Sequence, residues 1–248
     1  MSNAVSITGT IITHNEEVRI AEAISSLSCC DEVLVVDSGS TDRTREIAER
    51  CGARVVTRAW DGYSRQKNFA ASEAHHDWIL SLDADERVSA ELASEIAQWK
   101  RSGQRDRAAG SMPRRVFYLG AWIHHSGWYP DRKLRLYDRR RGTWRGDLVH
   151  ETLAIDGAIV RFTGDLLHFP YRTWQDHIQR IDRYTKLAAE AARKNGKRGN
   201  VLRLLLAPPL IFFKAFILRA GFLDGWRGVL IAAAGARYVF QRELRILR

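Results

Sequence analysis

The feature that most constrains the fold is the regular alternation of short apolar runs and helical patterns over the first 90 residues. Runs rich in β-branched residues, expected as strands, lie at 5–14, 31–40, 53–60 and 77–83. Amphipathic stretches, expected as helices, lie at 16–28, 41–52 and 64–74. This alternation predicts βαβ units around a mostly parallel, Rossmann-like sheet flanked by helices. Because open parallel sheets bind ligands at the carboxyl ends of their strands, the residues that end these runs are the first candidates for function.

The rest of the chain has a different character. Between 110 and 170 the pattern changes to short β-like pieces with many aromatic and basic residues, typical of a mixed sheet with binding loops. Helical signals return at 173–196. The chain opens with no basic-then-apolar leader, and its three cysteines have no CxxC spacing, which favours reduced thiols in a cytosolic protein without a zinc site.

The fourth apolar run stops abruptly at two aspartates, Asp83 and Asp85, separated by Ala84. Carboxylates at positions i and i+2 of an extended or turning backbone can reach one cation. Hard oxygen ligands suit Mg²⁺ or Mn²⁺, which in turn bind phosphate oxygens. An aspartate N-cap for the following helix is the alternative, although Ser89 is the better cap. The pattern favours a divalent-metal site at this strand end.

A further carboxylate, Asp37, ends the second run within the sequence VVDSGSTD. A carboxylate at this position can accept hydrogen bonds from a nucleobase or a ribose, and Gly39 permits close approach of the ligand. The alternative is a structural turn with an N-cap from Thr41 or Asp42. The sequence has no GxGxxG, which disfavours a dinucleotide site.

Four segments, TIITHNEE, VLVVDSGSTDRT, RQKNFAAS and WILSLDADE, resemble in order and spacing the inverting family 2 glycosyltransferases, which have the GT-A fold. The resemblance covers about residues 6–170. The segments GWYPDRKLRLYDRRRG, VHE and FFKAFILRAGFLDGWRG are similar more narrowly to bacterial glycosyltransferases of the lipopolysaccharide core, of the β-1,4-glucosyltransferase type. The resemblance implies a GT-A catalytic domain over 1–172, with a nucleotide-binding half (1–110) and an acceptor-binding half (111–172). A basic, amphipathic helical region that associates with the membrane then occupies 173–248.

The resemblance also implies roles for the strand-end residues. Thr13, Asn15 and Glu16 are expected in the loop that meets the nucleotide, and Asp37 is expected to meet the base or ribose of a UDP-sugar.

Four further residues are expected near the same nucleotide: Lys67, where the family commonly has arginine, Asn68, Asp83 and Ala84. Asp83 and Asp85 stand at the metal-binding pair. A divalent ion on the diphosphate would stabilise the charge that develops as the sugar leaves.

The attacking hydroxyl needs a general base, because its pKa lies far above neutrality. Glu151, in GDLVHETL, follows a strand-like run where this family places its base, and His150 stands beside it. Asp147 and Asp131 are reserves, since the family's usual acidic pair is not present in standard form. The alternative for Glu151 is an ion pair with one of the many arginines.

The segment 127–146 is expected as a loop that mixes aromatic and basic side chains. Aromatic faces suit sugar C–H surfaces, and guanidinium groups suit phosphates or acidic sugars. Trp128, Tyr129 and Arg135 are therefore predicted to bind an anionic glycolipid acceptor, with single-stranded nucleic acid or a solvated hairpin as alternatives. His168 stands where some GT-A enzymes have a third metal ligand, and a core or capping histidine is the alternative.

The net charge of +10 belongs to the tail, where residues 193–248 carry twelve Lys or Arg against two acids. The apolar run 204–218 is shorter than the roughly 20 residues that span a bilayer, and it contains Pro208-Pro209 and Lys214. Basic amphipathic helices that bear tryptophan lie in the headgroup plane and are attracted to anionic lipid. We therefore expect peripheral attachment to the inner face of the cytoplasmic membrane, with a helical pair packed on the domain or a dimer contact as alternatives.

These features predict a metal-dependent enzyme that moves a hexose from a UDP-sugar to a sugar hydroxyl of the lipopolysaccharide inner core. Glucose is expected through the resemblance alone. One alternative keeps the fold but makes a polyprenyl phosphate the acceptor, which needs no general base. Another is a basic nucleic-acid-binding module, which the strand-end aspartates disfavour because they repel phosphate.

Overall fold

The computed structural model describes residues 5–103, 106–146 and 151–247. The chain divides into two compact units, the first formed by residues 1–114 and 132–168, the second by residues 115–131 and 169–248. The second unit therefore contains the C-terminal helices. It also contains residues 115–131, which lie in the predicted acceptor-binding half (111–172).

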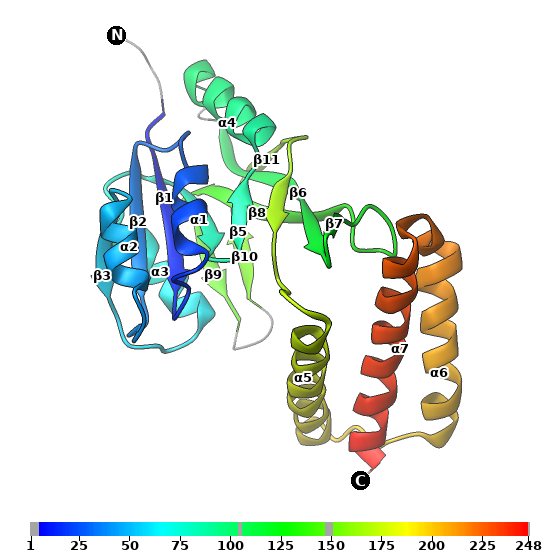
Figure 1. Ribbon diagram of the computed structural model, residues 1–248. Coiled ribbons are helices and arrows are strands. Elements are labelled where there is room, and N and C mark those ends of the chain that lie inside the picture. The colour runs from blue at the N-terminus through cyan, green and yellow to red at the C-terminus, as the bar shows by residue number, and fades with distance from the viewer. Residues whose placement is uncertain (1–4, 104–105, 147–150, 248) are drawn as a thin grey trace. The chain divides into compact units, whose positions relative to one another are not determined.

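The first unit is built on a mixed sheet with the strand order β3-β2-β1-β4-β8-β6-β12-β5, and β11 pairs with β6 (Figure 1). The strands in chain order are β1 (Ile7–Thr13), β2 (Glu32–Asp37), β3 (Arg54–Thr57), β4 (Trp78–Asp83), β5 (Glu86–Val88), β6 (Arg107–Tyr118), β8 (Asp131–Asp138), β11 (Ala158–Arg161) and β12 (Leu166–His168). Strands β1 to β4 pair in parallel, which confirms the βαβ prediction. Strand β8 is antiparallel to β4, and β12 is antiparallel to β5. A separate antiparallel pair joins β9 (Gly142–Arg145) to β10 (Thr152–Ile155).

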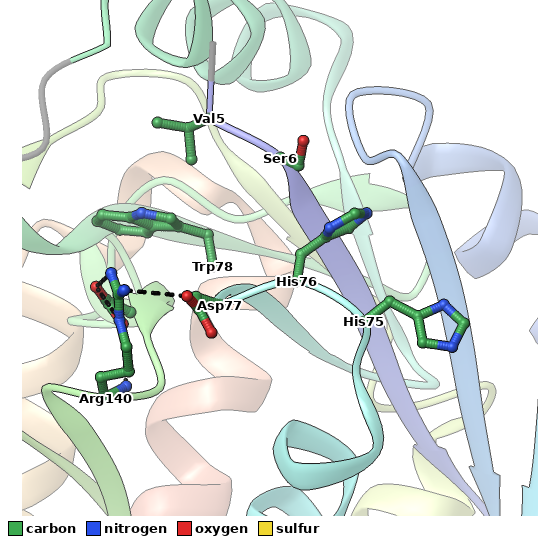
Figure 2. Close-up of a pocket in the computed structure, with 8 residues that line it drawn as sticks. Val5, Ser6, His75, His76, Asp77, Trp78 and Arg140 are labelled. Carbon is green, nitrogen blue, oxygen red and sulfur yellow. Dashed lines mark hydrogen bonds and ion pairs between the residues drawn. The ribbon is translucent and has the colours of Figure 1, made fainter. Parts of the chain in front are cut away.

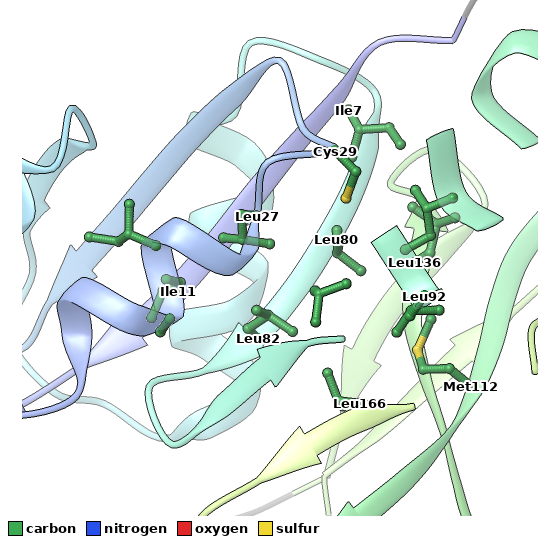
Figure 3. Close-up of a cluster of buried hydrophobic side chains, with 14 of the residues drawn as sticks. Ile7, Ile11, Leu27, Cys29, Leu80, Leu82, Leu92, Met112, Leu136 and Leu166 are labelled. Carbon is green, nitrogen blue, oxygen red and sulfur yellow. The ribbon is translucent and has the colours of Figure 1, made fainter. Parts of the chain in front are cut away.

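Helices cover both faces of this sheet, and the alternation of side chains along the strands explains why. The helices are α1 (Ile20–Ser26), α2 (Thr44–Arg50), α3 (Tyr63–Glu73) and α4 (Ala90–Ser102). Ile7 and Ile11 of β1 belong to the main core with residues of α1, α2 and α4, part of which Figure 3 draws. Ile12 points to the opposite face and packs with Ala70 of α3. Burial on both faces is the reason these strands read as continuous apolar runs.

The helix starts agree with the capping residues in the sequence. Ser89 caps α4 and accepts the N–H of Leu92, as predicted. In the second unit, α5 (Trp174–Lys194) begins with a capping box between Thr173 and Asp176, which confirms the helix expected at 173–196.

The second unit consists mainly of three long helices. Helix α6 (Val201–Phe213) continues into a π-helical turn at Lys214–Leu218, a 3₁₀ turn follows at Gly221–Asp224, and α7 (Trp226–Leu247) returns along α6. Helix α7 packs against both α5 and α6 (Figure 1). The short strand β7 (Ala121–Trp122) pairs with the end of β6, and an aromatic core around Tyr118 and Ile231 joins these pieces.

The apolar run 204–218, with its two prolines, lies within a longer helical stretch. Helix α6 passes through Pro208 and Pro209, and the helical stretch Val201–Leu218 is long and apolar enough to cross a membrane by length and composition. Proline has a helical φ, so its main cost here is the loss of N–H donors to the carbonyls one turn earlier. Packing along α7 offsets that cost. None of this stretch is buried within the protein.

Candidate active site

The carboxyl ends of β1, β2 and β4 bring predicted residues to one edge of the sheet. Thr13 is paired in register with Asp37 of β2, and the preceding residue, Ile12, is paired with Asp83 of β4. Because parallel strands in near register end at the same place, the predicted strand-end residues lie together at this edge.

Asp37 is buried, and its carboxylate organises the turn that follows it. Oδ2 accepts the N–H groups of Gly39 at 3.0 Å and Ser40 at 2.9 Å, and Oδ1 accepts the Ser40 hydroxyl. Gly39 has a φ of 81°, which favours glycine. The Asn15 side chain joins this turn, because its Oδ1 accepts the N–H of Thr41 at 2.8 Å. The alternative of a structural turn thus accounts for these hydrogen bonds of Asp37.

The loop that follows β1 is also attached to the segment that follows β2. Glu16 donates its N–H to Thr44 Oγ1 at 2.8 Å, and its carboxylate lies 3.3 Å from Arg19. The Oγ1 of Thr13 is buried and has no hydrogen-bond partner among the described residues. These contacts hold the two loops at a fixed spacing beside the strand ends.

A chain of charged groups starts at Asp83. Lys67 Nζ lies 3.0 Å from Asp83 Oδ1 and 3.2 Å from Glu151 Oε1, and Arg135 Nη2 lies 2.7 Å from Asp83 Oδ2 and 2.6 Å from Glu86 Oε1. Lys67, Arg135 and Glu86 are all buried. Burial by itself raises the pKa of Asp83, but Arg135 and Lys67 outweigh it and hold that pKa well below the usual range. Burial likewise lowers the pKa of Arg135, but Asp83 and Glu86 outweigh it and raise that pKa further above its ordinary value.

Sequence reasoning missed two buried members of this region. Glu86 accepts the N–H of Asp83 and also pairs with Arg114 at 3.2 Å. Gln66 donates its side-chain amide to Ser38 Oγ at 2.9 Å. The signal for Glu86 was its position directly after Asp-Ala-Asp, where an acid inside a β-like piece needs a basic partner.

The segment 127–146 is not the loop that the sequence predicted. Strand β8 occupies Asp131–Asp138 in the interior of the sheet, and β9 follows at Gly142–Arg145. Arg135 is therefore a buried strand residue, 5% exposed, whose guanidinium is bound by two carboxylates. Trp128 and Tyr129 belong to the second unit, so their assignment to an acceptor stays a prediction.

Asn68 and Lys67 both meet Trp144 of β9. Asn68 donates its amide to the carbonyl of Trp144 and accepts the N–H of the same residue, each at 2.9 Å. Lys67 Nζ lies 4.5 Å from the centroid of the Trp144 ring. Asn68 therefore attaches α3 to β9 and fixes the aromatic ring beside the buried ammonium group.

Asp85 and His168 are the pair best placed to hold a metal ion. The antiparallel pairing of β12 with β5 brings His168 Nε2 to 3.4 Å from Asp85 Oδ2. His168 Nδ1 is buried without a hydrogen-bond partner in the described part of the chain. Within the same ranges, no group of three His, Cys, Asp or Glu side chains is arranged as a metal site. Carboxylate oxygen and imidazole nitrogen fit a divalent ion such as Mn²⁺. Both carboxylate oxygens of Asp83 already meet Lys67 or Arg135, so a metal ion at Asp83 would have to share an oxygen with one of these side chains.

The remaining base candidates are placed as follows. Oε1 of Glu151 meets Lys67, whereas its Oε2 makes no hydrogen bond or ion pair with residues 5–103, 106–146 or 151–247. Asp147 and His150 lie outside the described residues. Asp131 belongs to the second unit.

A pocket of about 350 Å³ lies at the opposite edge, where β1 and β4 begin (Figure 2). Val5, His76 and Trp78 line it, and Arg140 pairs there with Asp77 at 3.1 Å. The predicted strand-end residues lie at the other ends of these strands, so we assign this pocket no part in the candidate active site.

Comparison with known proteins supports the family that the sequence motifs resemble. Residues 10–161 match the family "Glycosyl transferase family 2". The chain belongs to this family of glycosyltransferases, and its α/β fold is GT-A-like.

Two relatives and one solved structure are similar to this chain over most of its length. An uncharacterized glycosyltransferase of Rickettsia typhi is 33% identical over 96% of this chain and 86% of its own length. The lipopolysaccharide core biosynthesis glycosyltransferase LpsC of Rhizobium meliloti is 31% identical over 95% of this chain and 90% of its own. The crystal structure of S. aureus TarS 1–349 in complex with UDP-GlcNAc is similar with a TM-score of 0.50 and 15% identity, covering 97% of this chain and 90% of TarS. That structural likeness supports the fold alone.

Proposed function

We propose that this protein transfers a hexose, glucose in our assignment, from a UDP-sugar to a sugar hydroxyl of the lipopolysaccharide inner core, with inversion at the anomeric carbon. Membership of family 2 supports the transferase activity, and the similarity to LpsC supports the acceptor class. The observation that carries the proposal is the buried ammonium of Lys67, which links the strand-end Asp83 to Glu151.

In this proposal Glu151 is the general base. Its Oε1 is engaged by Lys67, so Oε2 takes the proton of the acceptor hydroxyl as that oxygen bonds to the anomeric carbon. The bond from the anomeric carbon to the β-phosphate oxygen breaks on the opposite side, and UDP leaves. Lys67 and Arg135 supply fixed positive charge next to Asp83, in a setting from which water is largely excluded.

Asp85 and His168 would hold the divalent ion, with Asp83 at its edge. When bound, Mg²⁺ or Mn²⁺ would supply positive charge to the diphosphate. The loop residues Thr13, Asn15 and Glu16, together with Asp37, Asn68 and Ala84, would shape the nucleotide pocket, in part through the backbone that their side chains hold in place.

The second unit would attach the enzyme to the inner face of the cytoplasmic membrane. Large apolar side chains of α6, including Leu202, Leu205 and Leu210, are more than 60% exposed. Apolar surface of this extent marks an interaction site. The tail also carries the whole net charge of +10, which suits anionic lipid better than a neutral partner.

Titration calorimetry with UDP, GDP and ADP, each with and without Mn²⁺, tests the nucleotide class and the metal together. We expect UDP to bind, with an affinity that rises when Mn²⁺ is present. Binding of none of the three, with nucleic acid retained on purification, would instead support the basic nucleic-acid-binding module.

Glu151→Gln tests the acceptor chemistry. Turnover should fall by about 10²–10⁴-fold, while UDP affinity stays within about twofold. Glu49→Gln, at an exposed position of α2, is the control and should leave both unchanged. Turnover that survives Glu151→Gln would point to an acceptor that is already ionised, such as a polyprenyl phosphate.

A further inference from the structure

The second unit contains a pocket of about 410 Å³ next to the turn between α6 and α7. Six residues line it, namely His124, His125, Gly127, Tyr129, Pro130 and Arg219. Among the described residues the lining includes an arginine and two imidazoles but no carboxylate. Such a lining favours an anionic ligand.

Asp224 clamps the two segments that form this pocket. Its carboxylate is buried and accepts the N–H groups of His124 and His125 and the hydroxyl of Ser126, each at 3.1 Å. His125 Nδ1 lies 3.2 Å from the same carboxylate. Ser126 in turn donates its N–H to the carbonyl of Arg219 at 3.0 Å. The negative charge of Asp224 is therefore satisfied behind the pocket, and it fixes the loop against the turn.

Arg219 is held at the pocket by a close approach to the backbone. Gly127 has a φ of 78°, and a Cβ at this position would lie 2.0 Å from Arg219 Nη1. A side chain at 127 would thus displace the guanidinium. In the described part of the chain no carboxylate forms an ion pair with Arg219, and its side chain is exposed. The guanidinium is positioned, charged and available to a ligand.

Exposed apolar side chains adjoin this arginine in the sequence. Leu218 is 69% exposed, Phe222 50% and Leu223 61%. An exposed cation within a short segment that also carries exposed apolar residues suits an amphiphile, whose charged head and apolar tails need neighbouring sites of both kinds.

We propose that this pocket binds a phosphate group in the head of a membrane amphiphile. The planar guanidinium of Arg219 would take two phosphate oxygens, and the histidines would meet the remaining oxygen. The acyl chains would lie along Leu218 and Phe222. This inference rests on the proposed membrane attachment and deepens it, because the bound amphiphile is a membrane phospholipid.

Vesicle sedimentation of the full chain tests the pocket without any nucleotide. Three vesicle types are compared: phosphatidylcholine alone, phosphatidylcholine with phosphatidic acid, and phosphatidylcholine with oleate at the same surface charge. The wild type should bind the phosphatidic acid vesicles about tenfold more tightly than the oleate vesicles. Arg219→Gln should abolish this preference. Arg237→Gln removes the same charge from an exposed position of α7 and should retain it.

Each other outcome has a definite meaning. Equal binding to phosphate and carboxylate vesicles, or equal effects of Arg219→Gln and Arg237→Gln, would overturn the phosphate pocket and leave only charge attraction. Soluble competitors can also be added to release the protein from the vesicles. If millimolar inorganic phosphate releases it as effectively as short-chain phosphatidic acid does, the part of the proposal that concerns the acyl chains is overturned. Binding to no vesicle at all would overturn the proposed membrane attachment, whereas the transferase proposal is judged separately by UDP binding.

Discussion

The two units of this protein treat charge and apolar surface in opposite ways. In the first unit, the charged side chains of Lys67, Arg135 and Glu86 lie inside at the carboxyl edge of the sheet. Arg135 is paired with Glu86, and both cations are paired with Asp83. In the second unit, large apolar side chains lie outside, and none of the stretch Val201–Leu218 is buried. Neither arrangement is what a protein surrounded only by water would need.

In our proposal the contrast reflects the different surroundings of the two units. Buried ions are retained at a cost, so a cluster of them at a strand edge indicates an organised field for a charged ligand. Exposed leucines are tolerated where the surroundings are lipid. In our proposal the first unit is therefore organised around a polar reaction, and the second around attachment to lipid.

The largest effect should come from removing the buried ammonium. Lys67→Met should abolish sugar transfer, with a loss of at least about 10²-fold in turnover. It should also lower the free energy of unfolding by about 3 kcal/mol, because Asp83 and Glu151 lose their shared cation. Turnover and urea denaturation are the measurements.

Lys100→Met is the control for that prediction, since Lys100 pairs with Asp31 near the surface at 2.6 Å. It should cost less than about 1 kcal/mol and leave turnover unchanged. Equal losses of unfolding free energy in the two variants would show that the buried ion pairs of Lys67 contribute no more stability than a surface pair.

The next effect concerns the exposed apolar side of the second unit. Leu205→Gln should weaken binding to anionic vesicles by about tenfold, because a leucine side chain contributes about 1.5–3 kcal/mol when it leaves water. Leu187→Gln, at an exposed position of α5, should change vesicle binding by less than twofold. UDP binding serves as the measure that both variants remain folded. Equal losses of vesicle binding in the two variants would show that the exposed leucines of α6 do not contact lipid more than other exposed leucines do.

A smaller effect concerns His177, a histidine that the second unit buries beside Tyr118 in its aromatic core. Burial, helped by Arg180, lowers the pKa of His177 to about 4 from an ordinary 6.5. His177 is therefore neutral in the folded protein. Its contribution to stability is complete above pH 6.5 and is lost as the pH falls towards 4.

Ring-proton NMR should show His177 titrating near pH 4, with the signal assigned by its loss in His177→Gln. The thermal midpoint of the wild type should fall more than that of the variant between pH 7 and pH 4.5. A titration near 6.5 would mean that this core is accessible to water.

The smallest effect is expected at the start of α5. Thr173→Ala removes the capping box with Asp176 and should cost about 1 kcal/mol, measured by denaturation, whereas Thr173→Ser should restore most of it. If the serine variant is as unstable as the alanine variant, the methyl group of Thr173 and not its hydroxyl is what matters.

The sequence determined the βαβ half and the edge at which its candidate site residues gather. Strand periodicity, capping residues and the polar residues at the strand ends are local signals, so Asp37, Asp83 and the cap at Ser89 could be placed without coordinates. The same signals misjudged 127–146, where strands β8 and β9 lie in place of the expected loop, and they left the structure of 204–218 open. A basic strand is stable only where distant acids meet it, and a helix with two prolines persists because a second helix packs along it.

Only the tertiary structure decided which charges meet. Lys67, Asp83, Arg135 and Glu151 come from four separate segments, and the pairing of β5 with β12 alone brings Asp85 to His168. Composition gives the number of charges but not their distances. The energy of an ion pair depends on separation and on exclusion of water, and both of these are set by packing.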